Sequence, residues 1–86
     1  MTGDWDKFRD LLNAQYQWPT PYRFKFVVPM TSLPRLESAL EGKKLDFKPS
    51  KTGKYMSVTY TGQMGSADEI IEVYQRLQNI PGIITL

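Results

Sequence analysis

The chain has 86 residues, which is enough for one domain and too few for a second. It contains no cysteine and no histidine, so disulfides, thiol nucleophiles, histidine general bases and the usual Cys or His metal sites are excluded. Eleven Lys and Arg against nine Asp and Glu give a net charge of +2, which by itself does not indicate nucleic-acid binding.

The N-terminal segment, residues 1–17, is predicted to be an amphipathic helix that precedes a main domain over residues 18–86. Trp5, Phe8 and Leu12 recur every three or four residues and therefore share one helical face. We expect this face to pack on the chain's own domain. The alternative is that it is an exposed contact surface for a partner protein.

Residues 22–28 alternate between apolar and mostly charged side chains, which predicts a half-buried strand. Thr31 and Ser32 are candidates for the N-cap of a following helix of about nine or ten residues. Gly42 is typical of the end of such a helix. The apolar stripe of this helix consists of Leu33, Leu36 and Leu40.

Residues 45–50 form the second predicted strand, and Pro49 marks it as an edge strand or as its end. Gly53 lies in a hairpin connection and is free to adopt positive φ. The third predicted strand spans residues 55–61, and the glycines within 62–65 predict a turn after it.

Ser66 and Glu69 match the capping-box pattern of a helix N-terminus. A second main helix follows, because apolar residues recur at helical spacing. Residues 83–86 are predicted to form a short last strand. The apolar face of the second helix consists of Ile70, Val73, Tyr74 and Leu77.

After the N-terminal helix, the predicted order is therefore β-α-β-β-α-β, the α+β arrangement of a ferredoxin-like sandwich. In this fold the sheet is antiparallel, and the first and third strands are central. Both helices cover one face of the sheet, and the other face is open. The open face is therefore one surface on which a partner can bind.

Three stretches of the chain, Trp18–Lys25, Lys48–Val58 and Ile70–Leu86, resemble the YbeD-like family of small bacterial proteins of unknown function. The resemblance covers residues 18–86. It implies a ferredoxin-like fold similar to ACT regulatory domains, which bind small molecules at subunit interfaces. A homodimer is therefore one assembly that the resemblance allows. The family brings no catalytic residues with it.

Positive charge collects around the predicted hairpin, since residues 43–54 hold five lysines and one acid, Asp46. Ammonium groups with hydroxyls beside a glycine turn are typical of phosphate or carboxylate sites. The alternative is that the lysines keep an exposed strand edge soluble. The predicted contact surface combines the hairpin with the first strand: Lys48, Ser50, Lys51, Thr52, Lys54, Tyr55, Arg23 and Lys25.

We expect a small cytoplasmic regulatory or adaptor module that binds an anionic metabolite or a protein partner through this surface, with no cofactor and no metal. The alternative is a single-stranded RNA-binding module that uses the open sheet face. RNA-recognition modules stack bases on aromatic side chains of the two central strands, and here only Tyr55 is in place. RNA is therefore the second choice.

We do not expect an enzyme, because no acid–base or nucleophilic pair has a spacing that suggests catalysis. No apolar run reaches the ~18–20 residues that a membrane span needs. The N-terminus shows no apolar core of a secretory signal, which is the basis for expecting a cytoplasmic protein.

Overall fold

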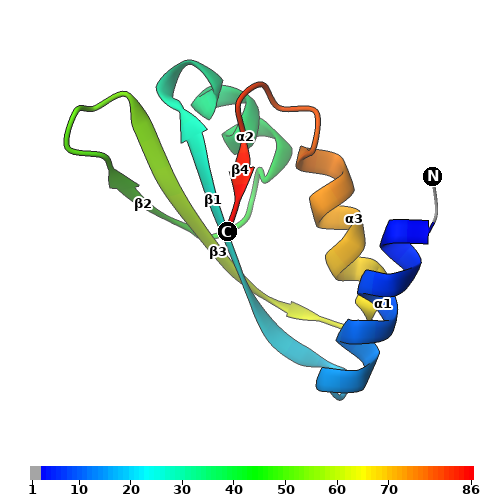
Figure 1. Ribbon diagram of the computed structural model, residues 1–86. Coiled ribbons are helices and arrows are strands. Elements are labelled where there is room, and N and C mark those ends of the chain that lie inside the picture. The colour runs from blue at the N-terminus through cyan, green and yellow to red at the C-terminus, as the bar shows by residue number, and fades with distance from the viewer. Residues whose placement is uncertain (1–2) are drawn as a thin grey trace.

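The computed structural model describes residues 3–86, so residues 1 and 2 of the predicted N-terminal segment lie outside the described residues. Figure 1 shows the helices gathered on one side of a twisted sheet. The elements are, in chain order, α1 (Gly3–Gln15), β1 (Thr20–Pro29), the 3₁₀ turn η1 (Met30–Ser32), α2 (Leu33–Ala39), β2 (Leu45–Pro49), β3 (Tyr55–Met64), α3 (Ala67–Leu77) and β4 (Ile84–Thr85).

The strands form one antiparallel sheet in the order β2-β3-β1-β4. The two central strands, β1 and β3, pair along their full length, from Thr20 opposite Met64 to Pro29 opposite Tyr55. After α1, the order of elements and the central position of β1 and β3 are those of the ferredoxin-like fold. The predicted fold class is therefore confirmed.

The core lies between the sheet and the helices. On β1, Phe24, Phe26 and Val28 are buried, whereas Arg23 and Lys25 are exposed on the opposite face. This alternation follows from the period of two along a strand and confirms the predicted orientation of β1. The helices and β3 complete the core with Leu36, Val58, Tyr60, Ile70 and Leu77.

The N-terminal helix α1 packs against α3. Leu12 is 3% exposed and belongs to the core, and the ring of Phe8 meets that of Tyr74 edge-on, with 5.6 Å between their centroids. The Arg9 guanidinium donates to Asp68 of α3 across 2.6 Å. The aromatic face of α1 is therefore directed toward the chain's own α3.

The two predicted helix caps have different outcomes. The Ser66 Oγ accepts the Glu69 N–H at 3.3 Å, so this cap is confirmed, and the Glu69 carboxylate accepts the Gly65 N–H at 2.8 Å. The prediction that Ser32 caps α2 through its side chain is wrong. Its hydroxyl instead donates to the Pro81 carbonyl at 2.7 Å, because the chain before β4 lies against it.

Three predicted boundaries are also wrong. The turn expected at 62–65 begins later, because β3 continues to Met64. Gly62 lies within β3 and leaves room for Tyr60, whose Oη would lie 2.5 Å from a Cβ at position 62. The helix α2 has seven residues, and β4 has two instead of the four expected over 83–86.

Candidate functional site

The β2–β3 hairpin projects from the sheet away from the helices (Figure 1). Its residues 46–55 are all exposed. The Ser50 N–H donates to the Tyr55 carbonyl at 2.9 Å, and the Gly53 N–H donates to the Ser50 carbonyl at 3.0 Å. Gly53 has φ +74°, a conformation that favours glycine. The hairpin connection therefore has the predicted geometry.

A hollow of about 570 Å³ lies on the open face of the sheet beside this hairpin. The strand register creates it, because Lys25 and Asp46 both lie opposite Thr59, and Lys48 lies opposite Ser57. Residues directly opposite each other share one face of a sheet. We call this site the hairpin hollow; its lining residues are Lys25, Asp46, Phe47, Lys48, Pro49, Ser50, Lys51, Ser57 and Thr59.

The hairpin hollow is positively charged, since its lining contains three lysines and one aspartate. Within residues 3–86, Lys25, Lys48 and Lys51 form no ion pair. Ser57 and Thr59 are half-buried on the central strand β3 and add two hydroxyl groups. Ammonium and hydroxyl donors around one hollow can bind the oxygens of a phosphate or carboxylate.

The structure brings together four of the eight predicted site residues: Lys25, Lys48, Ser50 and Lys51. The hydroxyl oxygen of Ser50 also accepts the Tyr55 N–H at 3.2 Å, so this side chain helps to hold the hairpin. The other four predicted residues lie outside the lining of the hollow: Arg23, Thr52, Lys54 and Tyr55.

Sequence reasoning did not assign Asp46, Ser57 or Thr59 to the site. The alternation along β2 indicates that Asp46 shares a face with Lys48, because the two residues are two positions apart. The register, which brings Asp46 and Lys25 to the two sides of Thr59, needs the structure.

Among residues 3–86, no group of three potential Asp or Glu ligands is arranged to hold a metal ion. No helix in the same part of the chain is both long and apolar enough to cross a membrane.

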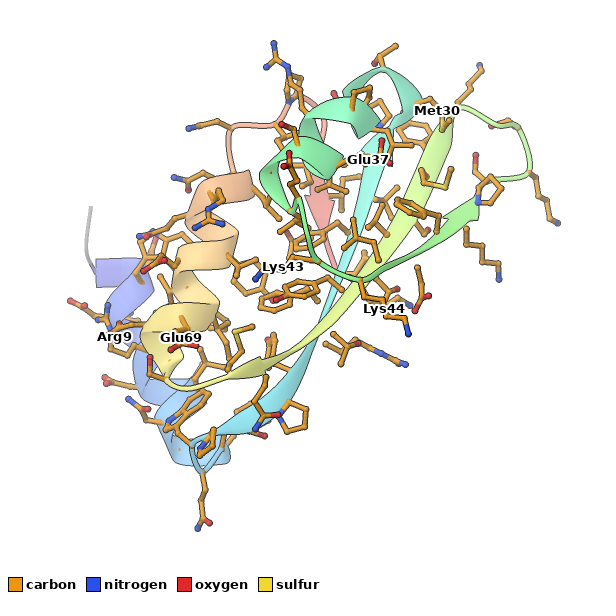
Figure 2. All side chains as sticks on the ribbon, turned by 180° about the vertical axis from the view of Figure 1, so that it is seen from behind. Arg9, Met30, Glu37, Lys43, Lys44 and Glu69 are labelled. Carbon is orange, nitrogen blue, oxygen red and sulfur yellow. The ribbon has the colours of Figure 1, made fainter. Side chains whose placement is uncertain are left out.

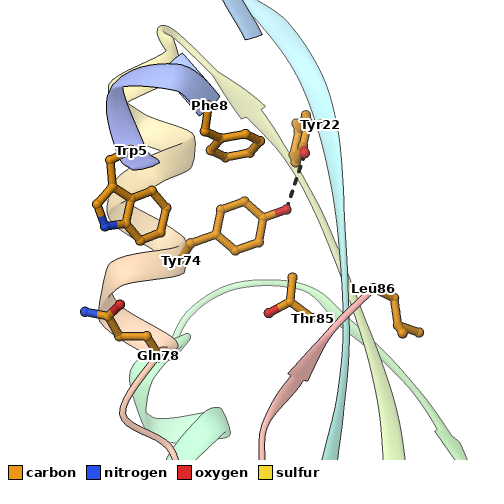
Figure 3. A pocket seen from close by; sticks show the side chains of 7 residues that line it. All are labelled: Trp5, Phe8, Tyr22, Tyr74, Gln78, Thr85 and Leu86. Atoms are coloured by element: carbon orange, nitrogen blue, oxygen red, sulfur yellow. Dashed lines mark hydrogen bonds between the residues drawn. The ribbon is translucent and has the colours of Figure 1, made fainter. Parts of the chain in front are cut away.

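A second cavity, of about 460 Å³, lies between α1, α3, β1 and β4 (Figure 3). Its walls are mainly aromatic. The hydroxyl groups of Tyr22 and Tyr74 lie 3.3 Å apart and form a hydrogen bond. We call this site the aromatic cavity; its lining residues are Trp5, Phe8, Tyr22, Tyr74, Gln78, Thr85 and Leu86.

Burial raises the pKa of the Tyr74 phenol above its ordinary value of 10.0, and the hydrogen bond with Tyr22 adds to the increase. The unfolded chain therefore loses this proton at lower pH than the folded chain. The stability that comes from the neutral phenol is fully present below about pH 10 and is lost as the pH rises through the folded pKa.

We therefore expect the free energy of unfolding, measured in urea at increasing alkaline pH, to fall above about pH 10. The Tyr74→Phe variant should show a shallower decline, because it has no phenol to ionise at this position. Tyr55→Phe is the matched control, since Tyr55 lies at the exposed hairpin, and it should keep the wild-type slope. Equal slopes in all three proteins would contradict this expectation.

The sequence of residues 13–86 matches a family described as "Protein of unknown function (DUF493)". No curated protein matches the chain. Among solved structures, the solution structure of protein HP0495 from H. pylori is similar, with a TM-score of 0.63 and 22% sequence identity. The alignment covers 84% of this chain and 86% of that one, and at this identity the likeness shows the fold alone.

Proposed function

We propose that this chain, a member of the DUF493 family, is a non-catalytic regulatory or adaptor module of the cytoplasm. Its membership follows from the family match, which spans most of its length and confirms the resemblance to the YbeD-like family. In this proposal the module binds a small anionic ligand in the hairpin hollow. The family description names no function, so the proposal is based on the geometry of this chain.

One observation carries the proposal. Lys25 of β1 and Lys48 and Lys51 of the hairpin converge on the same hollow, beside the hydroxyls of Ser57 and Thr59. If the lysines served only to keep an edge strand soluble, a lysine on a central strand would not be needed for that purpose. Lys25 lies on a central strand, so edge protection does not explain its place in the hollow.

The size and chemistry of the hairpin hollow favour a small, compact anion. Its volume of about 570 Å³ falls in the usual range for small-molecule sites. Lysine binds phosphate as a mobile point charge, and serine and threonine hydroxyls add directional hydrogen bonds. Asp46 repels negative charge at one side, which favours a ligand with localised charge near the lysines.

Single-stranded RNA remains the second candidate. RNA-recognition modules stack two or three bases on aromatic side chains of the central strands. On the described strands, Tyr55 is the one aromatic residue whose register places it on the open face, and β1 offers Arg23, Lys25 and Val27 there. This composition gives weaker support for base stacking than for binding a compact anion.

A thermal-denaturation screen tests the proposal. The purified protein is heated with inorganic phosphate, pyrophosphate, citrate or oligouridylate, each at low and at moderate salt. A small anion at one hundred times its Kd should add about 2.7 kcal/mol and raise the Tm by about 10–20 °C. This shift should persist at moderate salt for at least one small anion.

The two salt conditions separate the candidates. Binding of an oligonucleotide should weaken steeply with salt, because it releases counterions from the phosphate backbone. If stabilisation comes from oligouridylate alone and disappears with salt, the RNA candidate replaces the proposal. A Tm that none of the anions changes would contradict both.

A further inference from the structure

The aromatic cavity lies beside an edge of β1 that β4 leaves largely uncovered. β4 pairs with β1 only at Phe26 and Val27, and the Leu86 N–H then donates to the Lys25 carbonyl at 2.9 Å. Among residues 3–86, no strand pairs with this edge of β1 between Thr20 and Phe24. Several residues of a central strand therefore have a free edge.

The backbone direction at this edge follows from the observed hydrogen bond. The Lys25 carbonyl points away from β3, toward Leu86. Backbone groups point to alternate sides along a strand, so the N–H and C=O of Arg23 point to the same side as that carbonyl. Arg23 therefore offers one donor and one acceptor to a further strand, and such unpaired edges are templates for strand addition.

The register predicts where the side chains of an added strand would lie. Residues directly opposite each other share a face. A residue paired with Arg23 would point to the open face, and its two neighbours, opposite Tyr22 and Phe24, would point to the helix face. The aromatic cavity lies on the helix face at this position, between Tyr22, Phe8 and Tyr74 (Figure 3).

The charge of Arg23 determines which side chain is preferred in the added strand at the position opposite it. Arg23 is exposed, and within residues 3–86 it forms no ion pair. An acidic side chain directly opposite a cation on the same face stabilises strand pairing. The helix-face positions meet aromatic walls without a lysine, arginine or carboxylate side chain, so they prefer large apolar side chains.

We propose that the free edge of β1 binds an extended peptide segment of a partner protein, in which one acidic residue lies between two large apolar residues. The backbone of the segment pairs with Arg23, its apolar side chains enter the aromatic cavity, and its acidic side chain contacts the Arg23 guanidinium. Trp5 and Phe8, which line the cavity, lie before the matched family segment 13–86. The proposal does not depend on anion binding in the hairpin hollow, which Arg23 does not line.

The test uses a synthetic pentapeptide that begins with phenylalanine, aspartate and phenylalanine and has an amidated C-terminus, because Leu86 already lies opposite Lys25 and the segment can extend only toward Thr20. Its affinity is measured by NMR titration, which follows the backbone amide signal of Arg23. Methylation of the aspartate nitrogen removes the N–H that would pair with the Arg23 carbonyl, and the affinity should fall at least about tenfold. Methylation of the next nitrogen, which points away from β1, should leave the affinity unchanged.

A protein variant provides an independent test of the proposal. Arg23→Pro removes the N–H at the free edge without removing a hydrogen bond between β1 and β3, and proline is tolerated on such an edge. This variant should retain the wild-type far-UV circular dichroism spectrum and bind the peptide at least about tenfold more weakly. The methylated peptides test the proposal even where this variant does not fold.

Two results would overturn the proposal. The first is no saturable binding of the unmodified peptide. The second is equal affinity of the two methylated peptides, which would mean that the aromatic cavity takes an apolar side chain without strand pairing. Competition by free indole would identify that simpler mode of binding.

Discussion

Phe24→Ala is expected to reduce the free energy of unfolding by about 3–5 kcal/mol, as large-to-small changes of buried aromatic residues do. Phe24 is fully buried at the centre of the sheet. Its ring stacks on Tyr60 with 5.3 Å between centroids and an interplanar angle of 8°. It also meets Tyr22 and Tyr74 edge-on, at 4.8 and 5.3 Å. Removing the ring therefore leaves a cavity bounded by these three aromatic rings and by that of Phe26.

The loss is large in relation to the whole domain. A domain of this length is stable by about 4–13 kcal/mol, so this single substitution removes about a quarter of the total or more. Urea unfolding followed by far-UV circular dichroism measures the change. Phe47→Ala is the matched control, because Phe47 lies on the same face of the sheet but is 44% exposed on the edge strand β2.

We expect Phe47→Ala to cost about 1 kcal/mol or less, since much of this side chain is already in contact with water. A Phe24→Ala protein that is unfolded without denaturant would agree with the expectation. If the two variants lost the same small amount of stability, Phe24 would not be at the centre of the core.

The second large effect concerns the hairpin hollow. The double variant Lys48→Gln, Lys51→Gln removes two of the three lysines that line it. Hydrogen bonds to charged groups contribute about 1.5–3 kcal/mol each, so the affinity for the small anion identified in the thermal screen should fall at least about tenfold. Isothermal titration calorimetry measures this change at fixed ionic strength.

The control removes the same amount of charge at another place. Lys43 and Lys44 lie in the segment before β2, at the end of that strand far from the hairpin (Figure 2). Lys44 precedes Lys48 by four residues, about 13 Å along an extended chain, which exceeds the distance over which physiological salt screens exposed charges. Lys43→Gln, Lys44→Gln should therefore keep the wild-type affinity. An equal loss in both double variants would indicate attraction to the overall charge and no defined site.

Local patterns predicted much of the fold because they follow directly from backbone geometry. The alternation around Phe24 and Phe26 identified β1 and its buried face, and Ser66 identified the start of α3. The failures came from contacts between distant parts of the chain. Ser32 has the chemistry of an N-cap, but its hydroxyl binds Pro81, a residue 49 positions away, and sequence proximity gives no sign of this contact.

Gly62 shows why a local signal can be misleading. Glycine after an apolar strand usually indicates a turn. Here Gly62 continues β3 opposite Tyr22, and its missing side chain leaves space for the Tyr60 ring on the same face. This use of glycine depends on how the neighbouring ring is oriented, which a sequence pattern does not specify.

The candidate site was predicted only in part, because contacts between distant strands bring its residues together. The charge around the hairpin could be read from the sequence, and so could the open face that carries Lys25. The convergence of Lys25 with Lys48 depends on the register of three strands, which places Ser57 and Thr59 between them. The aromatic cavity could not be predicted, because it requires the position of α1 on α3 and the short length of β4.

The most direct measurement is an NMR titration of the isotope-labelled protein with the small anion that gives the largest thermal shift. If the hairpin hollow is the binding site, the backbone signals of Ser50, Ser57 and Thr59 should move together and saturate at one Kd. Signals of Lys43 and Lys44 should stay in place. Shifts spread over all lysines without saturation, or confined to residues outside the hollow, would contradict anion binding at this site.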